Sequence, residues 1–228
     1  MAKYYMADLF DFFGEVRDNN DRAWFACHKE RYLDLRAQWL ADVDRLIAAM
    51  TAFEPALAGQ TAKSCAYRFY RDTRFSTDKS PFKTYFSAAF TDRGRKAVRA
   101  GYYLQTGLPG EYTDTGIYAG IWCPDAPLLK RLRKDIVDNV DEFRGIVESP
   151  EMTAVFPQWA GETLKTVPKG WDRNHPDADL LRRKDYGRFA PLSSKFFLDP
   201  SWPEKTAEMF AAAAPMVRFL NYSIDNPE

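Results

Sequence analysis

Four runs of aromatic and β-branched residues lie between Cys65 and Trp122, and the segments that join them are short. The runs cover residues 67–75, 84–91, 101–106 and 112–121. Parallel strands need a crossover of about a dozen or more residues, whereas antiparallel strands need only a turn. Because each joining segment is shorter than that, the sequence predicts a mostly antiparallel sheet of about four strands.

Helical patterns flank this region on both sides. Apolar residues recur every three or four positions from residue 22 to residue 50, and Asn20 or Asp21 is suited to cap the start of this long helix. A shorter helix is expected at residues 8–17. Later helices are expected after Pro124, after Asp141 and near Pro203, with an interruption at Pro215. Helices, then strands, then helices indicate one α+β domain over residues 1–228.

The composition excludes two classes of protein. Apolar residues make up 46% and aromatic residues 15% of the chain, which is typical of a globular protein and not of a disordered one. The sequence lacks a run of about eighteen apolar residues and a signal-peptide pattern, so we expect neither a membrane span nor export. Cys27, Cys65 and Cys123 show no CxxC spacing, so we expect no disulfide framework and a cytoplasmic setting.

The charge is distributed unevenly, although the net charge is zero. Residues 63–99, the first basic block, contain ten Lys and Arg against three Asp and Glu. Residues 161–195, the second basic block, contain eight against five. Any proposed function has to account for this uneven distribution of charge along a neutral chain.

The stretch YRFYRDTRFSTDKSPFKTYF, residues 67–86, combines five cationic and seven aromatic side chains with only two carboxylates. On a strand, the cations would lie on both faces, so that neither face is clearly hydrophobic. The STDKSP sequence that follows is typical of a turn, whose hydroxyl and backbone N–H groups can hold an anion. The pattern predicts an anion-binding site formed by Arg68, Arg71, Arg74, Lys79 and Lys83.

A structural role for the same residues stays open, because surface cations are usually solvated and cations on an edge strand prevent aggregation. Asp72 and Asp78 lie among cations that would keep them ionised, so both suit ion pairs better than acid catalysis. Asp72 is nevertheless retained as a candidate catalytic residue.

Three segments resemble one known family. They are RFYRDTRFSTDKSPFKT in the first block, NNDRAWFACHKERY near the start and LKTVPKGWDRNHPDADLLRRKDY in the second block. They are similar to signature segments of domain of unknown function 2461, an uncharacterised family of mostly bacterial proteins, and the resemblance runs from Leu9 to about Leu220. At Phe82 the family more often has Tyr, which argues against a role that needs a hydroxyl there. The resemblance implies that both basic blocks belong to the family pattern, and it implies no reaction.

The second basic block alternates cations with carboxylates. One interpretation is that Lys165, Lys169, Arg182 and Lys184 face the first block and complete one pocket from two distant segments. The alternative is a solvated loop whose charges pair with one another, because exposed ion pairs are common and individually weak.

The two histidines are the usual candidates for proton transfer. His28 lies with Arg36 in the apolar arc of the long helix, where a histidine is usually a hydrogen-bonded core residue, although two polar groups there can mark the border of a site. His175 precedes Pro176 in a predicted loop and is the better catalytic candidate. The sequence contains no HExxH, GxSxG, P-loop or GxGxxG motif, so we predict no metal site and no cofactor.

Three hypotheses on function remain open. The first is a cytoplasmic protein that binds a phosphorylated or carboxylated small molecule in an Arg/Lys cleft, either as a binding protein or as an enzyme that uses Asp72 or His175. The second is nucleic-acid binding, against which the zero net charge counts. The third is a protein-interaction module in which an acidic segment of a partner covers the basic strand.

Overall fold

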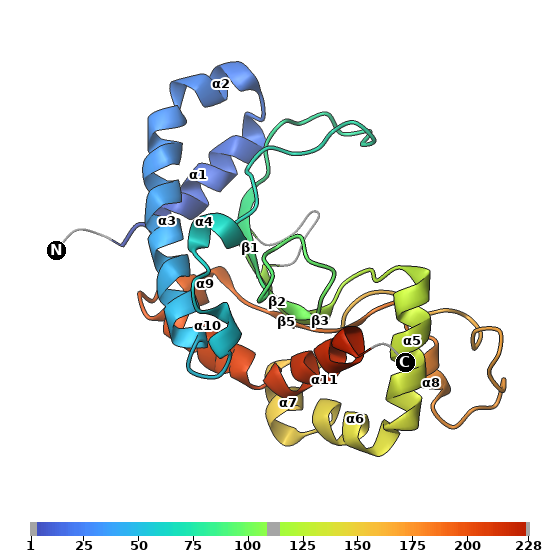
Figure 1. The fold of residues 1–228 in the computed structure, drawn as a ribbon. Coiled ribbons are helices and arrows are strands. Elements are labelled where there is room, and N and C mark those ends of the chain that lie inside the picture. Colours follow the sequence, from blue (N-terminus) through green and yellow to red (C-terminus); the bar gives the residue numbers. More distant parts are fainter. Residues whose placement is uncertain (1–3, 109–114, 227–228) are drawn as a thin grey trace. The chain divides into compact units, whose positions relative to one another are not determined.

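The computed structural model describes residues 4–108 and 115–226 (Figure 1). The helices are α1 (Met6–Asp18), α2 (Arg22–Cys27), α3 (Lys29–Met50), η1 (Pro55–Leu57), α4 (Ala62–Cys65), α5 (Ala126–Asp138), α6 (Val140–Val147), α7 (Pro150–Val155), α8 (Ala178–Leu181), α9 (Ser194–Phe197), α10 (Trp202–Ala211) and α11 (Ala214–Asp225). The strands are β1 (Tyr85–Phe90), β2 (Gly101–Gly107), β3 (Gly116–Ile121), β4 (Gln158–Trp159) and β5 (Tyr186–Pro191).

The described residues group into two compact units. Unit 1 is drawn from residues 1–95, 103–117 and 191–208, and unit 2 from residues 96–102, 118–190 and 209–228. The single domain expected over residues 1–228 stays a prediction.

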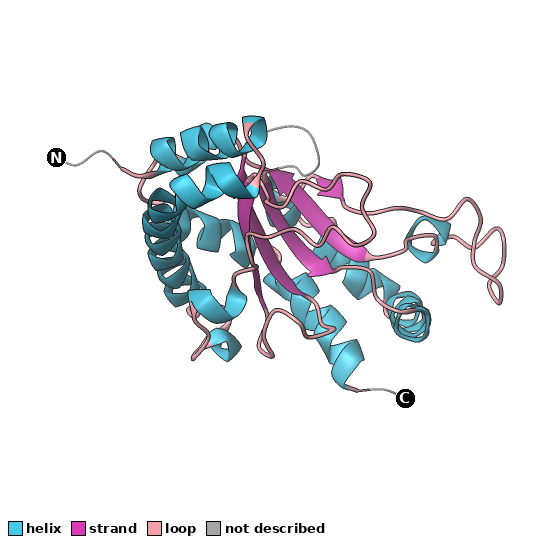
Figure 2. Ribbon diagram, turned by 90° about the horizontal axis from the view of Figure 1, so that it is seen from above, coloured by secondary structure: helices cyan, strands magenta, loops and turns pink. Residues whose placement is uncertain are grey.

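The strands form a five-stranded antiparallel sheet in the order β1-β2-β3-β5-β4, and Figure 2 shows them side by side. β1, β2 and β3 match three of the four predicted runs, and residues 112–114 of the last run lie outside the described residues. β4 and β5 were missed, because β4 has only two residues and β5 contains Gly187 and Pro191, which usually break strands. The predicted α+β class, with helices before and after the sheet, is confirmed.

The strand predicted at residues 67–75 was wrong. These residues, all of them described, make one isolated bridge, Tyr70 with Phe82, and a second bridge joins Ala66 to Ala88 just before them. The physical reason is the mixed pattern, since a run without an apolar face gains little from lying on a sheet. Residues 67–84 instead form a long loop between α4 and β1, drawn in teal above β1 in Figure 1. We call it the basic loop.

Unit 1 buries an aromatic core between α1, α3 and β1. Phe13 of α1, Trp39 of α3 and Phe86 of β1 are buried, and the ring of Phe86 lies 5.0 Å from that of Phe13 and 5.3 Å from that of Trp39. Each such ring contributes about 1.5–3 kcal/mol on burial. The helical period of α1 and the alternation of β1 therefore explain why these elements meet.

The single helix predicted from residue 22 to residue 50 is divided at His28. The predicted cap is confirmed, because the Asp21 carboxylate accepts hydrogen bonds from the backbone N–H groups of Ala23 (2.8 Å) and Trp24 (2.9 Å). At His28 the ring Nδ1 donates to the Trp24 carbonyl (2.8 Å), while the backbone N–H turns to the Phe25 carbonyl (3.1 Å). In a continuous helix the Trp24 carbonyl would accept the backbone N–H of His28. Here the imidazole occupies that carbonyl, so the helix is interrupted and α3 begins at Lys29.

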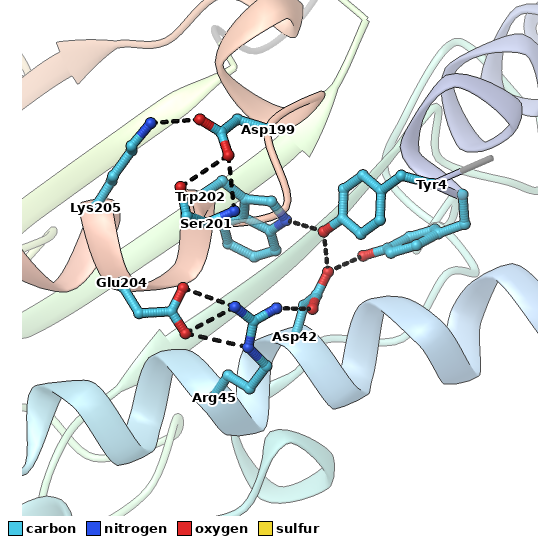
Figure 3. Close-up of polar contacts among 9 residues, drawn as sticks. Tyr4, Asp42, Arg45, Asp199, Ser201, Trp202, Glu204 and Lys205 are labelled. Carbon is cyan, nitrogen blue, oxygen red and sulfur yellow. Dashed lines mark hydrogen bonds and ion pairs between the residues drawn. The ribbon is translucent and has the colours of Figure 1, made fainter. Parts of the chain in front are cut away.

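A polar network joins the N-terminal segment, α3 and α10 within unit 1 (Figure 3). Asp42 is 6% exposed and accepts hydrogen bonds from the hydroxyls of Tyr4 and Tyr5 and from Arg45 (2.9 Å). The Trp202 indole N–H donates to the Tyr4 hydroxyl (2.9 Å), and Arg45 extends the network into α10. Burial raises the pKa of both tyrosines, so both hydroxyls stay protonated and able to donate.

Unit 2 contains the helices α5, α6, α7, α8 and α11. Asp125 caps α5 by accepting from the Leu128 N–H (2.9 Å), and Leu132 and Ile136 of its predicted apolar face are buried. Pro215 lies in the first turn of α11, which begins three residues after α10 ends, so the predicted interruption is confirmed.

Candidate functional site

The two arms of the basic loop are joined by backbone hydrogen bonds. The Arg71 N–H donates to the Pro81 carbonyl (2.9 Å), and the Lys83 N–H donates to the Phe69 carbonyl (3.0 Å). These bonds set the arms antiparallel without a regular strand. They fix the backbone positions from which Arg71 and Lys83 extend.

Aromatic rings anchor the base of this loop in unit 1. Phe69 and Phe82 are each 2% exposed, and their ring centres lie 5.6 Å apart. Phe82 also stacks on Phe25 of α2 at 4.2 Å, and Phe69 lies 4.9 Å from Tyr32 of α3. A buried tyrosine would need a partner for its hydroxyl, so phenylalanine at position 82 fits a packing role.

Asn20 clamps the same base to the segment before α2. Its side-chain amide donates to the Phe82 carbonyl and accepts from the Phe82 N–H, each at 3.0 Å. The amide thus satisfies both backbone groups of Phe82, as a neighbouring strand would. The start of α2 is therefore held beside the basic loop.

A pocket of about 300 Å³ lies between these two segments. Its lining residues come from positions 20–22 and from the two arms of the basic loop: Asn20, Asp21, Arg22, Tyr70, Arg71, Thr73, Lys79 and Pro81. The structure thus places Arg71 and Lys79, two of the predicted site residues, around one concave surface. It adds Arg22, which sequence reasoning missed because it lies in a segment far away along the chain.

The carboxylates near this pocket already have partners. Asp21 accepts from two backbone N–H groups of α2, and Asp78 accepts from Arg71 and from both the N–H and the hydroxyl of Ser80. The Ser80 hydrogen bonds and the Arg71 guanidinium hold the pKa of Asp78 well below its usual range. The Lys79 ammonium donates to the Thr73 carbonyl (2.9 Å), and no carboxylate in the part of the chain that the structure describes pairs with it.

The first arm of the basic loop carries the predicted residues Arg68, Asp72 and Arg74, none of which lines the pocket. Asp72 pairs with Arg74 at 2.7 Å and lies 3.9 Å from Arg68, and all three side chains are exposed. The Arg74 hydrogen bonds lower the pKa of Asp72 to about 2. At neutral pH Asp72 is thus an ion-pair partner, and its candidacy as a catalytic residue stays a prediction.

Lys83 and Arg36 lie on the β1 side of the loop. The Lys83 ammonium lies 5.7 Å from the Tyr67 ring centre and 5.2 Å from that of Tyr85. Arg36 of α3 donates to the Tyr67 carbonyl (2.8 Å) and stacks over Phe86 at 4.7 Å. The signal for Arg36 was present in the sequence, because it is one of the two polar residues in the apolar arc of the long helix.

The predicted residues of the second basic block lie in unit 2. Lys165 and Lys169 are exposed, Lys184 pairs with Glu162 at 2.6 Å, and Arg182 Nε donates to the Ala178 carbonyl (3.2 Å). Lys184 and Arg182 therefore have local partners, as in the interpretation of a self-paired loop. The two basic blocks belong to different units, and a shared pocket stays a prediction.

Two other arginines of the second basic block stack on Trp159. Sequence reasoning missed this contact. The guanidinium of Arg183 lies 4.3 Å from the indole and that of Arg188 lies 4.8 Å from it. Both arginines are buried, and they donate to the carbonyls of Ala160 (2.7 Å) and Phe156 (3.0 Å). These cations therefore stabilise unit 2 by stacking on the indole and by satisfying backbone carbonyls.

Asp185 is another residue that sequence reasoning missed. It is 3% exposed, and its Oδ1 has no hydrogen-bond partner among the described residues. Burial raises the pKa of Asp185 to about 6, although the charge of Arg183 opposes this. Its place in the run RRKDY suggested an exposed ion pair instead, so no sequence signal pointed to burial.

The histidines take structural hydrogen bonds. The His28 ring stacks on Trp24 at 3.9 Å, in addition to its bond to the Trp24 carbonyl. His175 Nδ1 accepts from the Asp177 N–H (3.1 Å), and its ring contacts Trp171 edge to face. The geometry of His28 matches the hydrogen-bonded residue expected from the sequence, and the catalytic role of His175 stays a prediction.

The described ranges contain no cluster of three or more His, Cys, Asp or Glu side chains with the arrangement of a metal site. Within the same residues, every helix is too short or too polar to cross a bilayer.

A known protein family matches most of the chain. Residues 8–219 match the conserved hypothetical protein family DUF2461. The chain belongs to this family. No curated protein and no solved structure matches it. The DUF2461 match includes the whole basic loop, the start of α2 and the second basic block, so the pocket is formed by residues that the family match covers.

Proposed function

We propose that this DUF2461 protein binds a phosphorylated or carboxylated small molecule in the pocket between the basic loop and the start of α2. The observation that supports this most is the presence of Arg22, Arg71 and Lys79 around one pocket whose lining carboxylate, Asp21, already caps α2. A guanidinium binds two oxygens of a phosphate or carboxylate at once, and an ammonium adds a mobile charge. Arg71 already pairs with Asp78, so a bound anion would add a counter-charge chiefly for Arg22 and Lys79.

The size of the pocket favours a small ligand. About 300 Å³ is at the lower end of the range for small-molecule sites, which suits a sugar phosphate or a dicarboxylate. Binding of single-stranded nucleic acid usually uses an extended groove with several stacking rings. Tyr70 is the one aromatic residue among those that line the pocket. A small anion is therefore the ligand that we propose.

The proposal is for binding and assigns no reaction to this pocket. Asp72 is held in ion pairs outside the lining residues, and His175 belongs to unit 2. The setting that we propose is a reducing cytoplasm, in which the free and exposed thiols of Cys27 and Cys123 would stay reduced.

A thermal-shift screen tests this proposal. The wild-type chain is mixed at fixed salt with nucleotides, sugar phosphates, dicarboxylates and short oligonucleotides. A ligand at 100 times its dissociation constant stabilises the fold by about 2.7 kcal/mol, which is several degrees. Loss of one charged hydrogen bond in Arg71→Ala or Arg22→Ala should weaken binding by about tenfold or more.

The matched control is Arg17→Ala, since Arg17 is an exposed arginine of unit 1 that pairs with Asp18 and does not line the pocket. Stabilisation by a small anion in wild type and Arg17→Ala, but not in Arg71→Ala, supports the proposal. If only the oligonucleotides stabilise the protein, the nucleic-acid hypothesis is favoured over a small anionic ligand. If no anion acts, the basic loop is structural or binds a protein partner.

A further inference from the structure

The Lys83 side chain occupies an unusual position for a lysine. It is half-buried at the base of the basic loop, where its ammonium faces the rings of Tyr67 and Tyr85. Among the residues that the structure describes, no carboxylate pairs with it. Cations over aromatic rings gain some stabilisation, but they lose the solvation that favours the charged form.

Two further cations lie close to the same amine. Burial lowers the pKa of Lys83 first, and the positive charges of Arg68 and Arg36 lower it further. Arg36 is held in place by the Tyr67 carbonyl and by the rings of Phe86 and Trp39, and its Nη1 is buried without a hydrogen-bond partner in the described chain. A desolvated lysine beside fixed cations has a larger fraction of neutral amine, which is the nucleophilic form.

We propose that Lys83 is a nucleophilic amine that forms an imine with an aldehyde or ketone carrying a carboxylate or phosphate. The inference rests on the proposed function, because the arginines of the same loop are to hold the anionic group. Arg71, which lines the pocket, influences the hydroxyl of Tyr85, the ring that Lys83 also faces. One of the anion-binding residues, Arg71, and the Lys83 amine thus act on the same tyrosine.

The reaction needs no oxidant or reductant. The lone pair of Nζ attacks the carbonyl carbon, and the carbonyl π electrons move to oxygen to form a carbinolamine. Nitrogen then forms the C=N bond as the hydroxyl, with a proton, leaves as water. The guanidinium of Arg68, an exposed arginine of the same loop, would bind the carboxylate or phosphate of the same molecule, which raises its local concentration at the amine.

Lys79 is the internal comparison, because it belongs to the same loop and differs in surroundings. Its ammonium is hydrogen-bonded to the Thr73 carbonyl in the exposed part of the loop. Treatment of the full chain with glyoxylate and cyanoborohydride near neutral pH converts any imine into a stable secondary amine, which peptide mass mapping locates. We expect labelling of Lys83 to be about tenfold faster than that of Lys79, through orientation of the anionic aldehyde.

Lys83→Arg keeps the positive charge and should abolish the main labelled site, whereas Lys63→Arg, at an exposed position of α4 that does not line the pocket, should leave it unchanged. Propanal, a neutral aldehyde, should label Lys83 more slowly than glyoxylate. Equal labelling of all exposed lysines would overturn the inference, and equal rates with propanal would overturn its anionic substrate class. If anions stabilise the protein through Arg71 but Lys83 is not preferred, this inference fails alone. If Lys83 is labelled selectively while no anion stabilises the protein, the proposed function fails instead.

Discussion

Gly161 approaches Asp185 so closely that no side chain fits between them. A Cβ at position 161 would lie 1.7 Å from Asp185 Oδ2, and Gly161 has φ +72°, where residues other than glycine are strained. We expect Gly161→Ala to lower the free energy of unfolding by about 2 kcal/mol or more. Urea denaturation measures this. Gly145→Ala is the matched control, because Gly145 lies in α6 with open space around it, and it should stabilise by about 0.5–1 kcal/mol.

Asp185 itself should make stability depend on pH. Because its pKa in the folded protein, about 6, exceeds the ordinary 3.8, the folded state binds this proton more tightly than the unfolded chain. Its contribution to stability is therefore fully present below about pH 3.8 and is lost as the pH rises through about 6. Asp185→Asn, which stays neutral, should be more stable than wild type at pH 8 by about 1–2 kcal/mol, allowing for solvent screening.

The measurement is urea unfolding of both proteins at pH 5 and at pH 8. The difference in free energy of unfolding between Asp185→Asn and wild type should be smaller at pH 5, where the wild-type carboxyl is largely protonated. A variant that is equally destabilised at both values would instead show that the geometry of the carboxyl, and not its charge, is what matters.

At the scale of elements, the position of the basic loop depends on Asn20. Asn20→Ala removes two hydrogen bonds to the backbone of Phe82 and leaves both backbone groups partly buried. We expect a loss of about 1–2 kcal/mol and faster amide hydrogen exchange in residues 67–84. Asn19→Ala is the control, since the Asn19 amide bonds only to the Glu15 carbonyl of α1. Equal exchange rates in both variants would show that the aromatic rings alone hold the loop.

The elements with a clear period were the ones that sequence analysis could predict. Apolar spacing located α1, α3 and α5, and capping chemistry put the start of the long helix at Asn20 or Asp21, where α2 begins. The break at His28 could not be predicted, because it depends on one ring bonding to a carbonyl four residues earlier. The run at residues 67–75 was misread, since strand propensity counted all of its aromatic rings, whereas Phe69 is buried against Tyr32 of α3 and Phe75 is exposed.

Part of the candidate site was predictable, because some of its residues lie close together in the sequence. Arg71 and Lys79 stand in a dense local run of cations, which a charge count detects. Arg22 reaches the pocket only because Asn20 and Phe25 hold the start of α2 against the loop. Contacts between distant segments leave no local signal, so its part in the pocket had to come from the structure.

At the scale of the whole chain, Asp42 links segments that are far apart in sequence. Asp42→Asn replaces a carboxylate that accepts from Tyr4, Tyr5 and Arg45 with an amide that also presents donors to them. We expect a loss of about 2–3 kcal/mol, which lowers the melting temperature by several degrees in a chain of this length. Asp34→Asn, at an exposed position of α3, should melt like wild type. Similar melting of the two variants would contradict a stabilising role for the network.

The basic loop combines a fixed base with a free tip. Phe69 and Phe82 are buried, while Phe75 between them is 95% exposed. A protease that cuts after aromatic residues should therefore cleave first at Phe75, as exposed loop tips are the usual sites of nicking. The two new ends would remain joined through the buried rings and the backbone bonds of the base, so the nicked chain should stay folded. The same position would accept an inserted tag or fluorophore, which makes the tip a natural place to report on events in the pocket below it.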